Sequence, residues 1–171
     1  MLNRLLRLVR HRWTKEAHHT LTADALERLR LRVAASEAQH SGEIRICVEA
    51  GLPNSYLLRA DAMPVLIRQR AMRQFGRLRV WDTEDNNGVL IYLCLSERAI
   101  ELVADRGVDR LVPAQQWNDV VQQLAAALRA GHYEQGLAQS IDAVSAVLTQ
   151  YFALQPGQRN PNELPDSVVL F

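Results

Sequence analysis

The feature that most constrains the fold is an uninterrupted apolar stretch from Val89 to Leu95. A helix that crosses a bilayer needs about 20 apolar residues, so this stretch is far too short to span a membrane. Short apolar runs, in which neighbouring side chains point to opposite faces, are typical of a strand covered on both sides. We therefore expect the segment from Gly88 to Leu95 to form a central, buried strand of a sheet.

Two further segments are predicted to be strands. Side chains of unlike polarity alternate from Glu43 to Glu49 and again from Ala99 to Ala104, which is the period of a strand with two different faces. Only the turn from Ser96 to Arg98 separates the central strand from the later one, so these two must pair antiparallel. A helical segment separates residues 43–49 from the central strand, which predicts a parallel pair with a right-handed connection.

Helical periodicity fills most of the remaining chain. We expect helices over residues 22–38, 56–75, 113–128 and 137–151. Pro64 marks either a kink in the second of these or the start of another helix. Helices and strands in this order predict an α/β fold, with a mixed sheet between two helical layers in a three-layer α/β/α sandwich.

Composition bounds the number of domains. The chain has 171 residues, of which 48% are apolar and 23% charged, which is enough for one domain with a buried core. We place that domain at residues 20–152, between a basic segment at residues 1–19 and a tail at residues 153–171 that holds three of the six prolines. The tail ends in the apolar residues Val168 to Phe171. We expect it to be extended, with these last residues docked on another surface.

Basic charge is concentrated at the N-terminus. Residues 1–19 carry five basic side chains against Glu16, although the formal charge of the whole chain is only +1. The apolar residues of this segment share one face of an amphipathic helix: Leu2, Leu5, Leu6, Val9 and Trp13. Such a helix packs on its own domain or on a dimer mate, or it lies on an anionic lipid surface. The small net charge argues against a nucleic-acid partner. The arginines interrupt any signal-peptide core, so we expect a soluble, cytoplasmic protein.

Motifs of known catalytic and nucleotide-binding sites are missing from the sequence. It contains no GxGxxG, GxxxxGK(S/T), GxSxG or HExxH. The two cysteines, Cys47 and Cys94, form no CxxC pair and are expected in the core. The five histidines show no metal-ligand spacing.

One polar cluster stands directly before the central strand. The segment from Asp82 to Gly88 holds three carboxylates and two carboxamides, the oxygen donors that Ca²⁺ and Mg²⁺ prefer. Its spacing is not that of an EF-hand, and Asn or Asp before Gly also favours a plain solvated turn. The predicted hairpin returns Asp105 next to this segment, and Glu43 joins them if its strand is a parallel neighbour. The candidate ligands for Ca²⁺ or Mg²⁺ are Asp82, Glu84, Asp85, Asn86, Asn87 and Asp105.

The same region resembles a known family. Residues 86–93, NNGVLIYL, are similar to the NNGVLLL hallmark of the TPM domain family, which occurs in thylakoid-lumen repair proteins, a nematode receptor modulator and many bacterial proteins. Segments 42–44, 96–108 and 131–137 also resemble that family, so the resemblance covers residues 40–150. Where the family usually has Gly-x-Gly after the hairpin, this chain has Asp105-Arg106-Gly107.

The resemblance implies a Rossmann-like α/β/α sandwich, divalent-cation binding and, from plant members, acid phosphatase activity. One hypothesis is a cation-binding interaction or regulatory module, whose N-terminal helix or C-terminal tail engages an unknown protein partner or a membrane surface. The alternative is a weak metal-dependent phosphatase for phosphate monoesters, in which the bound ion polarises a phosphoryl oxygen and binds the attacking water. No histidine base is placed for that reaction, which favours the first hypothesis. The catalytic residues and the oligomeric state stay open.

Overall fold

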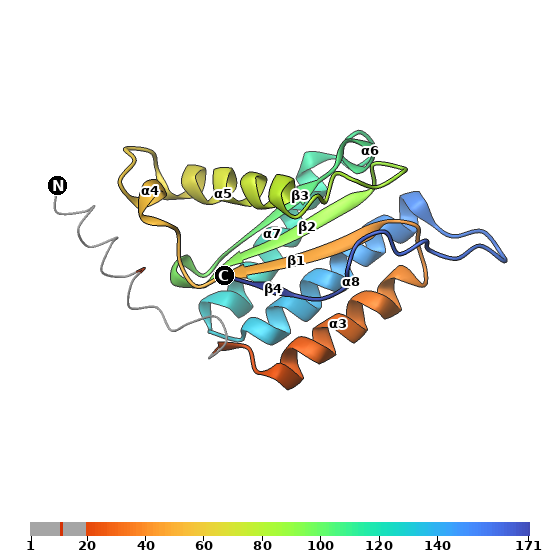
Figure 1. The fold of residues 1–171 in the computed structure, drawn as a ribbon, viewed down its shortest axis with the longest axis horizontal. Coiled ribbons are helices and arrows are strands. Elements are labelled where there is room, and N and C mark those ends of the chain that lie inside the picture. The colour runs from red at the N-terminus through yellow and green to blue at the C-terminus, as the bar shows by residue number, and fades with distance from the viewer. Residues whose placement is uncertain (1–10, 12–19) are drawn as a thin grey trace.

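The structure is a computed structural model that describes His11 and residues 20–171, so the helix predicted over residues 1–19 lies, apart from His11, outside the described residues. Figure 1 shows the ribbon. The elements are α3 (Ala23–Glu37), β1 (Glu43–Glu49), α4 (Asn54–Leu57), α5 (Met63–Arg77), β2 (Gly88–Cys94), a 3₁₀ turn (Leu95–Glu97), β3 (Ala99–Ala104), α6 (Arg106–Asp109), α7 (Ala114–Arg129), α8 (Tyr133–Phe152) and β4 (Val169–Leu170).

The strands form one mixed sheet in the order β3-β2-β1-β4. β2 pairs parallel with β1, where Glu43 lies beside Gly88, and antiparallel with β3, where Val89 lies beside Ala104. Every residue of β1 and β2 is buried, as expected for strands that are covered on both faces. The predicted buried strand, its hairpin and its parallel neighbour are confirmed.

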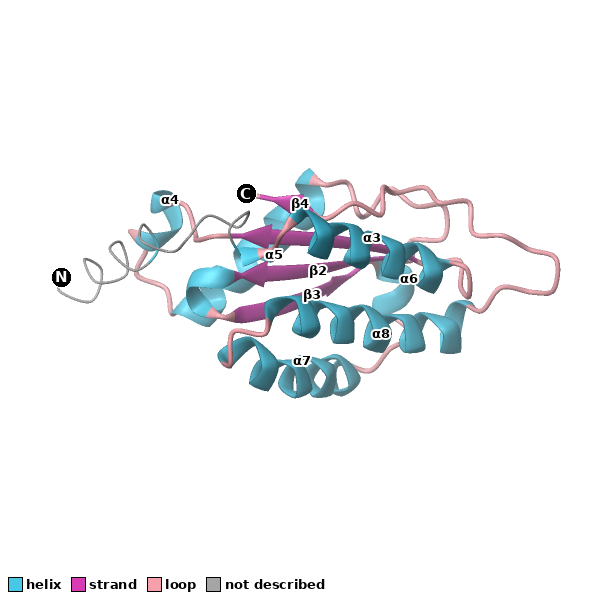
Figure 2. Cartoon of the chain, turned by 90° about the horizontal axis from the view of Figure 1, so that it is seen from below, coloured by secondary structure: helices cyan, strands magenta, loops and turns pink. Residues whose placement is uncertain are grey.

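Helices cover both faces of this sheet (Figure 2). On one face α3, α7 and α8 pack against Ile46 and Ile91 in the larger core cluster. On the other face α4 and α5 pack against Leu90 and Tyr92 in a second cluster. The predicted three-layer α/β/α sandwich is therefore confirmed. None of the helices in the described part of the chain is long and apolar enough to cross a membrane.

Local chemistry sets the helix ends. The Thr22 hydroxyl accepts a hydrogen bond from the Ala25 N–H at 3.2 Å and so caps α3. Pro64 stands in the first turn of α5, where it starts a helix and does not kink one. The helix predicted over residues 56–75 is thus two helices, α4 and α5. Gly131 follows α7 with a φ of +83°, a backbone conformation that costs glycine little.

Both ends of the described chain pack on the domain. The tail returns along the outer edge of β1, where β4 pairs parallel with Cys47 and Val48. The Phe171 N–H donates to the Val48 carbonyl at 2.9 Å, so the surface on which the last residues dock is the chain's own sheet. His11 is buried, and its Nδ1 accepts a hydrogen bond from the Leu52 N–H at 3.0 Å.

Candidate functional site

The loop before β2 lies at the end of the sheet where β1 and β2 begin and β3 ends. The Asn87 carbonyl accepts a hydrogen bond from the Glu43 N–H at 3.4 Å, and the Gly88 carbonyl accepts one from the Asp105 N–H at 2.8 Å. The hairpin therefore returns Asp105 to this loop, as the sequence predicts. The parallel pairing of β1 and β2 brings Glu43 to the same edge.

Close backbone contacts fix the shape of the loop. A Cβ on Gly88 would lie 2.1 Å from the Val80 carbonyl oxygen, so any other residue here would force the loop or the strand to shift. A Cβ on Gly107 would lie 2.6 Å from the carbonyl oxygens of Asp85 and Asn86, so the start of α6 packs directly on the loop. Asn86 itself has a φ of +52°, a left-handed conformation that asparagine tolerates. Gly88, Gly107 and Asn86 thus allow the loop to pack closely on the backbone of Val80 and on the start of α6.

Four of the six predicted ligands face solvent or a basic side chain. Asp82, Glu84 and Asp85 are exposed, and Asp82 forms an ion pair with Arg79. The half-buried Asn86 accepts a hydrogen bond through Oδ1 from the Arg106 guanidinium at 2.7 Å. Asp82 and Asn86 therefore already have cationic partners, whereas Glu84 and Asp85 keep their carboxylates in solvent.

The other two predicted ligands, Asn87 and Asp105, are buried, with 1% and 5% of their surface exposed. The Asn87 amide nitrogen donates to the Ser41 carbonyl at 2.9 Å, and Asp105 Oδ1 accepts from the Arg106 N–H at 2.7 Å. Their remaining oxygens, Asn87 Oδ1 and Asp105 Oδ2, are buried without a hydrogen-bond partner. A buried oxygen left in this state costs about 1–3 kcal/mol, so a cation or a donor that reached these atoms would stabilise the fold.

The predicted cation site depends on oxygen donors other than carboxylates. Within His11 and residues 20–171, no three Asp, Glu, His or Cys side chains converge closely enough to hold a metal ion. An ion at this loop would therefore need amide or main-chain oxygens in addition to carboxylates. Ca²⁺ and Mg²⁺ do use such mixed oxygen donors, so an ion at this loop stays a prediction.

Comparison with known proteins decides the family. The family model of the TPM domain matches residues 15–147. The chain belongs to the TPM domain family. Its structure is similar to the NMR structure of the BA42 protein from the psychrophilic bacterium Bizionia argentinensis, with 26% sequence identity, a TM-score of 0.73, and coverage of 87% of this chain and 94% of that one.

A second solved structure shares the fold of this TPM domain. The N-terminal domain of a protein from P. gingivalis is 21% identical, with a TM-score of 0.57 and coverage of 81% of this chain and 85% of that one. No curated protein matches the sequence.

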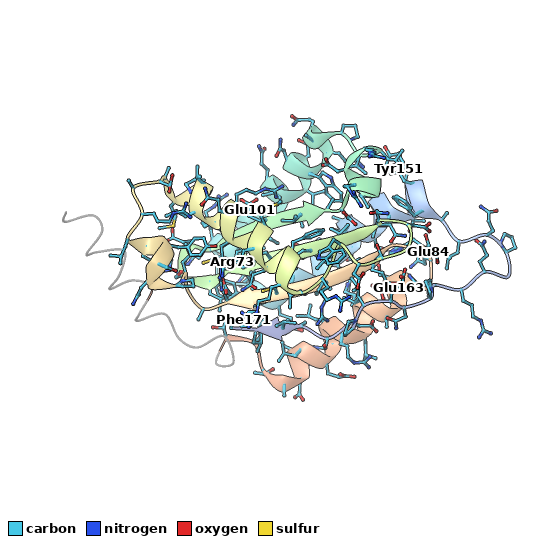
Figure 3. All side chains as sticks on the ribbon, turned by 45° about the horizontal axis from the view of Figure 1, so that its top comes forward. Arg73, Glu84, Glu101, Tyr151, Glu163 and Phe171 are labelled. Carbon is cyan, nitrogen blue, oxygen red and sulfur yellow. The ribbon has the colours of Figure 1, made fainter. Side chains whose placement is uncertain are left out.

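The C-terminal tail brings a further acidic group, Glu163, to the same end of this TPM domain, and the sequence did not predict it there. The Glu84 N–H donates to the Glu163 carboxylate at 3.1 Å, and Figure 3 shows the two residues side by side. Glu43 is fully buried. Its Oε2 accepts from the Leu164 N–H at 3.0 Å, and its Oε1 has no partner. Burial raises the pKa of Glu43. No local pattern places Glu163 here, because it reaches this edge only through the path of the tail, whereas Glu43 is placed by the pairing of β1 with β2.

A second polar network lies under α5, toward the other end of β1. The Glu49 carboxylate is 2% exposed and accepts hydrogen bonds from Arg70 Nε at 2.8 Å, Gln74 Nε2 at 2.6 Å and the Tyr92 hydroxyl at 2.6 Å. The bond to Glu49 raises the pKa of Arg70. Three donors satisfy this carboxylate, so Glu49 and Arg70 form a structural ion pair. The one oxygen of this network without a partner is Gln74 Oε1, which is buried.

The cysteines are core residues, as predicted. Cys47 and Cys94 are fully buried and unpaired. Burial raises the pKa of Cys47 to about 12 and that of Cys94 to about 11. Because the thiolate is the nucleophilic form, neither side chain can act as a nucleophile near neutral pH.

Proposed function

We propose that this TPM domain binds one divalent cation, Ca²⁺ or Mg²⁺, at the loop of residues 82–88 and Asp105, and that it works as a cation-dependent interaction or regulatory module. The observation that carries the proposal is the pair of buried, partnerless oxygens, Asn87 Oδ1 and Asp105 Oδ2, at one end of the sheet. Hard cations bind such oxygens, and the exposed carboxylates beside them supply negative charge.

The set of ligands that we propose is narrower than the set predicted from the sequence. Asn87 and Asp105 would hold the ion from the buried side, and Glu84 and Asp85 would do so from the solvent side. Asp82 and Asn86 contribute less to cation binding, because their oxygens already interact with the guanidinium groups of Arg79 and Arg106. Binding to the native state alone stabilises the fold by mass action, by about 2.7 kcal/mol at a hundred times the dissociation constant.

Isothermal titration calorimetry with CaCl₂ and MgCl₂ tests this proposal. Asp105→Asn keeps a side chain that can cap α6 but removes the buried charge, and we expect it to weaken binding by about tenfold or more. Asp142→Asn is the matched control, because Asp142 is an exposed carboxylate on α8 that pairs with Arg32. The proposal fails if the unmodified protein binds neither ion, or if both variants lose the same affinity.

The phosphatase alternative has less support. Hydrolysis by a metal-bound water is faster when a general base lies near the ion. The histidine nearest in sequence to Ser41 is His40, which is fully buried. Both of its ring nitrogens already form hydrogen bonds, at 3.0 Å to Ser36 Oγ and at 3.0 Å to the Gly42 carbonyl. Burial lowers the pKa of His40. We expect p-nitrophenyl phosphate with Mg²⁺ to turn over at the background rate. Metal-dependent turnover that Asp105→Asn abolishes and Asp142→Asn spares would make the site a hydrolase.

A further inference from the structure

A serine, a histidine and a glutamate lie in contact at the end of the sheet opposite the loop of residues 82–88. Ser96 Oγ is 2.7 Å from His11 Nδ1, and His11 Nε2 is 2.8 Å from Glu97 Oε1. The three side chains therefore form one continuous chain of hydrogen bonds. A hydroxyl next to a base that a third group orients is the arrangement by which enzymes activate a serine nucleophile.

This cluster lies beyond the carboxyl ends of the two parallel strands. Ser96 and Glu97 belong to the 3₁₀ turn directly after β2, and residues 50–52 directly follow β1. The Ser96 N–H donates to the Ala50 carbonyl at 3.0 Å, which joins the two connections. Open α/β sheets bind their ligands in the crevice outside the carboxyl ends of their strands. The three side chains thus lie where a site is expected in this fold.

The connection after β1 is shaped around the histidine and fixes its tautomer. A Cβ on Gly51 would lie 2.9 Å from the His11 carbonyl oxygen and 3.1 Å from Nδ1, so a larger residue would push against the ring. The Leu52 N–H donates to Nδ1 at 3.0 Å. A main-chain N–H can donate only to an unprotonated nitrogen, so the neutral ring carries its proton on Nε2. Nε2–H therefore donates to Glu97, and the Ser96 hydroxyl donates to Nδ1.

The exposure of the three residues follows the order that a nucleophile requires. The side chains of His11 and Glu97 are 2% and 11% exposed, whereas Ser96 is half-buried. The neighbouring residues Cys94 and Leu95 are buried, and Cys94 Sγ lies 3.4 Å from Ser96 Oγ. The base and the carboxylate are thus largely shielded from water, while the hydroxyl lies nearer to the surface.

We propose that Ser96 is a nucleophile that takes an acyl group from an uncharged carboxylic ester, with His11 as its base and Glu97 as a positioning residue. Oγ forms a bond to the carbonyl carbon while its proton passes to Nδ1. The bond from that carbon to the alcohol oxygen then breaks, and the alcohol leaves with the proton from Nδ1. Water releases the acid by the same two steps and restores the hydroxyl.

The neighbouring groups limit the substrate and the rate. The Glu97 carboxylate next to the ring repels an anion, so an uncharged ester fits better than a phosphate ester. Leu52 shares the lone pair of Nδ1 with Ser96, which weakens the base. We therefore expect reaction with activated esters. The site is independent of the cation proposed above, because the two are at opposite ends of the sheet.

Covalent labelling of the full-length protein with p-nitrophenyl acetate tests this serine. We expect peptide mass spectrometry to find an acetyl group on Ser96 and none on Ser55, the control, which is an exposed serine on α4. His11→Gln keeps an acceptor for the Leu52 N–H but removes the base, so it should slow the acetylation of Ser96 by about 100-fold or more. No acetylation of Ser96, or acetylation at an unchanged rate in His11→Gln, would overturn the proposal.

The tautomer of His11 tests the same arrangement in the unmodified protein without a substrate. Long-range ¹H–¹⁵N spectra of the ¹⁵N-labelled protein with a neutral ring should show the proton on Nε2. Glu97→Gln keeps an acceptor for Nε2–H, so the tautomer should persist, whereas loss of the charge should slow acetylation about tenfold or more. A proton on Nδ1 in the unmodified protein would show that Ser96 cannot donate to the ring, and the proposal would be wrong.

Discussion

Glu49 and Arg70 form a buried ion pair whose loss can be measured directly. Removing one partner leaves the other charge buried and unpaired, so Arg70→Met should lower the free energy of unfolding by about 3–5 kcal/mol. The double variant Glu49→Leu/Arg70→Met should regain most of that loss, because both charges are gone. Arg73→Met is the control, since Arg73 is exposed on the same helix. Urea unfolding of the unmodified protein and the three variants measures these free energies. Equal losses for Arg70→Met and Arg73→Met would contradict the buried ion pair.

At the scale of elements, the start of β2 depends on the absence of a side chain at Gly88. An alanine Cβ at this position would lie 2.1 Å from the Val80 carbonyl oxygen, so the loop or the strand must shift. We expect Gly88→Ala to lower the free energy of unfolding by about 1–3 kcal/mol. Gly76→Ala is the matched control, because nothing lies within 4 Å of a Cβ there, in the last turns of α5. That substitution should raise stability by up to about 1 kcal/mol, and destabilisation of the same size at both positions would contradict the account.

The same scale shows what the sequence could and could not predict. The strands from Glu43, Gly88 and Ala99 followed from periodicity and short connections, because these signals are local. The pairing that returns Asp105 to the loop followed from the hairpin alone. The path of the tail could not be predicted, because its proline-containing segment shows neither helical nor strand periodicity. Its docking depends on contacts between residues far apart in the sequence, such as that of Leu164 with Glu43. For that reason the position of Glu163 was missed, whereas the return of Asp105 and Glu43 to the loop was predicted from the strands.

For the whole molecule, Glu37, which is buried on α3, makes stability depend on pH. Burial raises its pKa from the ordinary value of 4.5 to about 8 in the folded protein, so the folded state holds this proton more tightly than the unfolded state does. The stabilisation is fully present below pH 4.5 and is lost as the pH rises to about 8, by at most about 1.4 kcal/mol per pH unit. His40 works in the opposite direction below about pH 6.5, because burial lowers its pKa.

The difference between the unmodified protein and Glu37→Gln isolates this contribution. We expect the free energy of unfolding of the unmodified protein to fall relative to that of the variant between pH 5 and pH 8.5, and to stay level above that range. Urea unfolding at several pH values measures both curves. Parallel curves over the whole range would show that Glu37 ionises in the folded protein as it does in the unfolded chain.

The measurement that tests cation binding most directly is a titration of the ¹⁵N-labelled protein with CaCl₂, followed by amide NMR shifts. The account predicts saturable shifts for the amides of residues 83–88 and 105–107, because these segments carry the partnerless oxygens of Asn87 and Asp105 and contact each other through Gly107. The amides around Asp142 should not move. Saturable shifts confined to other segments, or no shift at millimolar Ca²⁺ and Mg²⁺, would contradict the account.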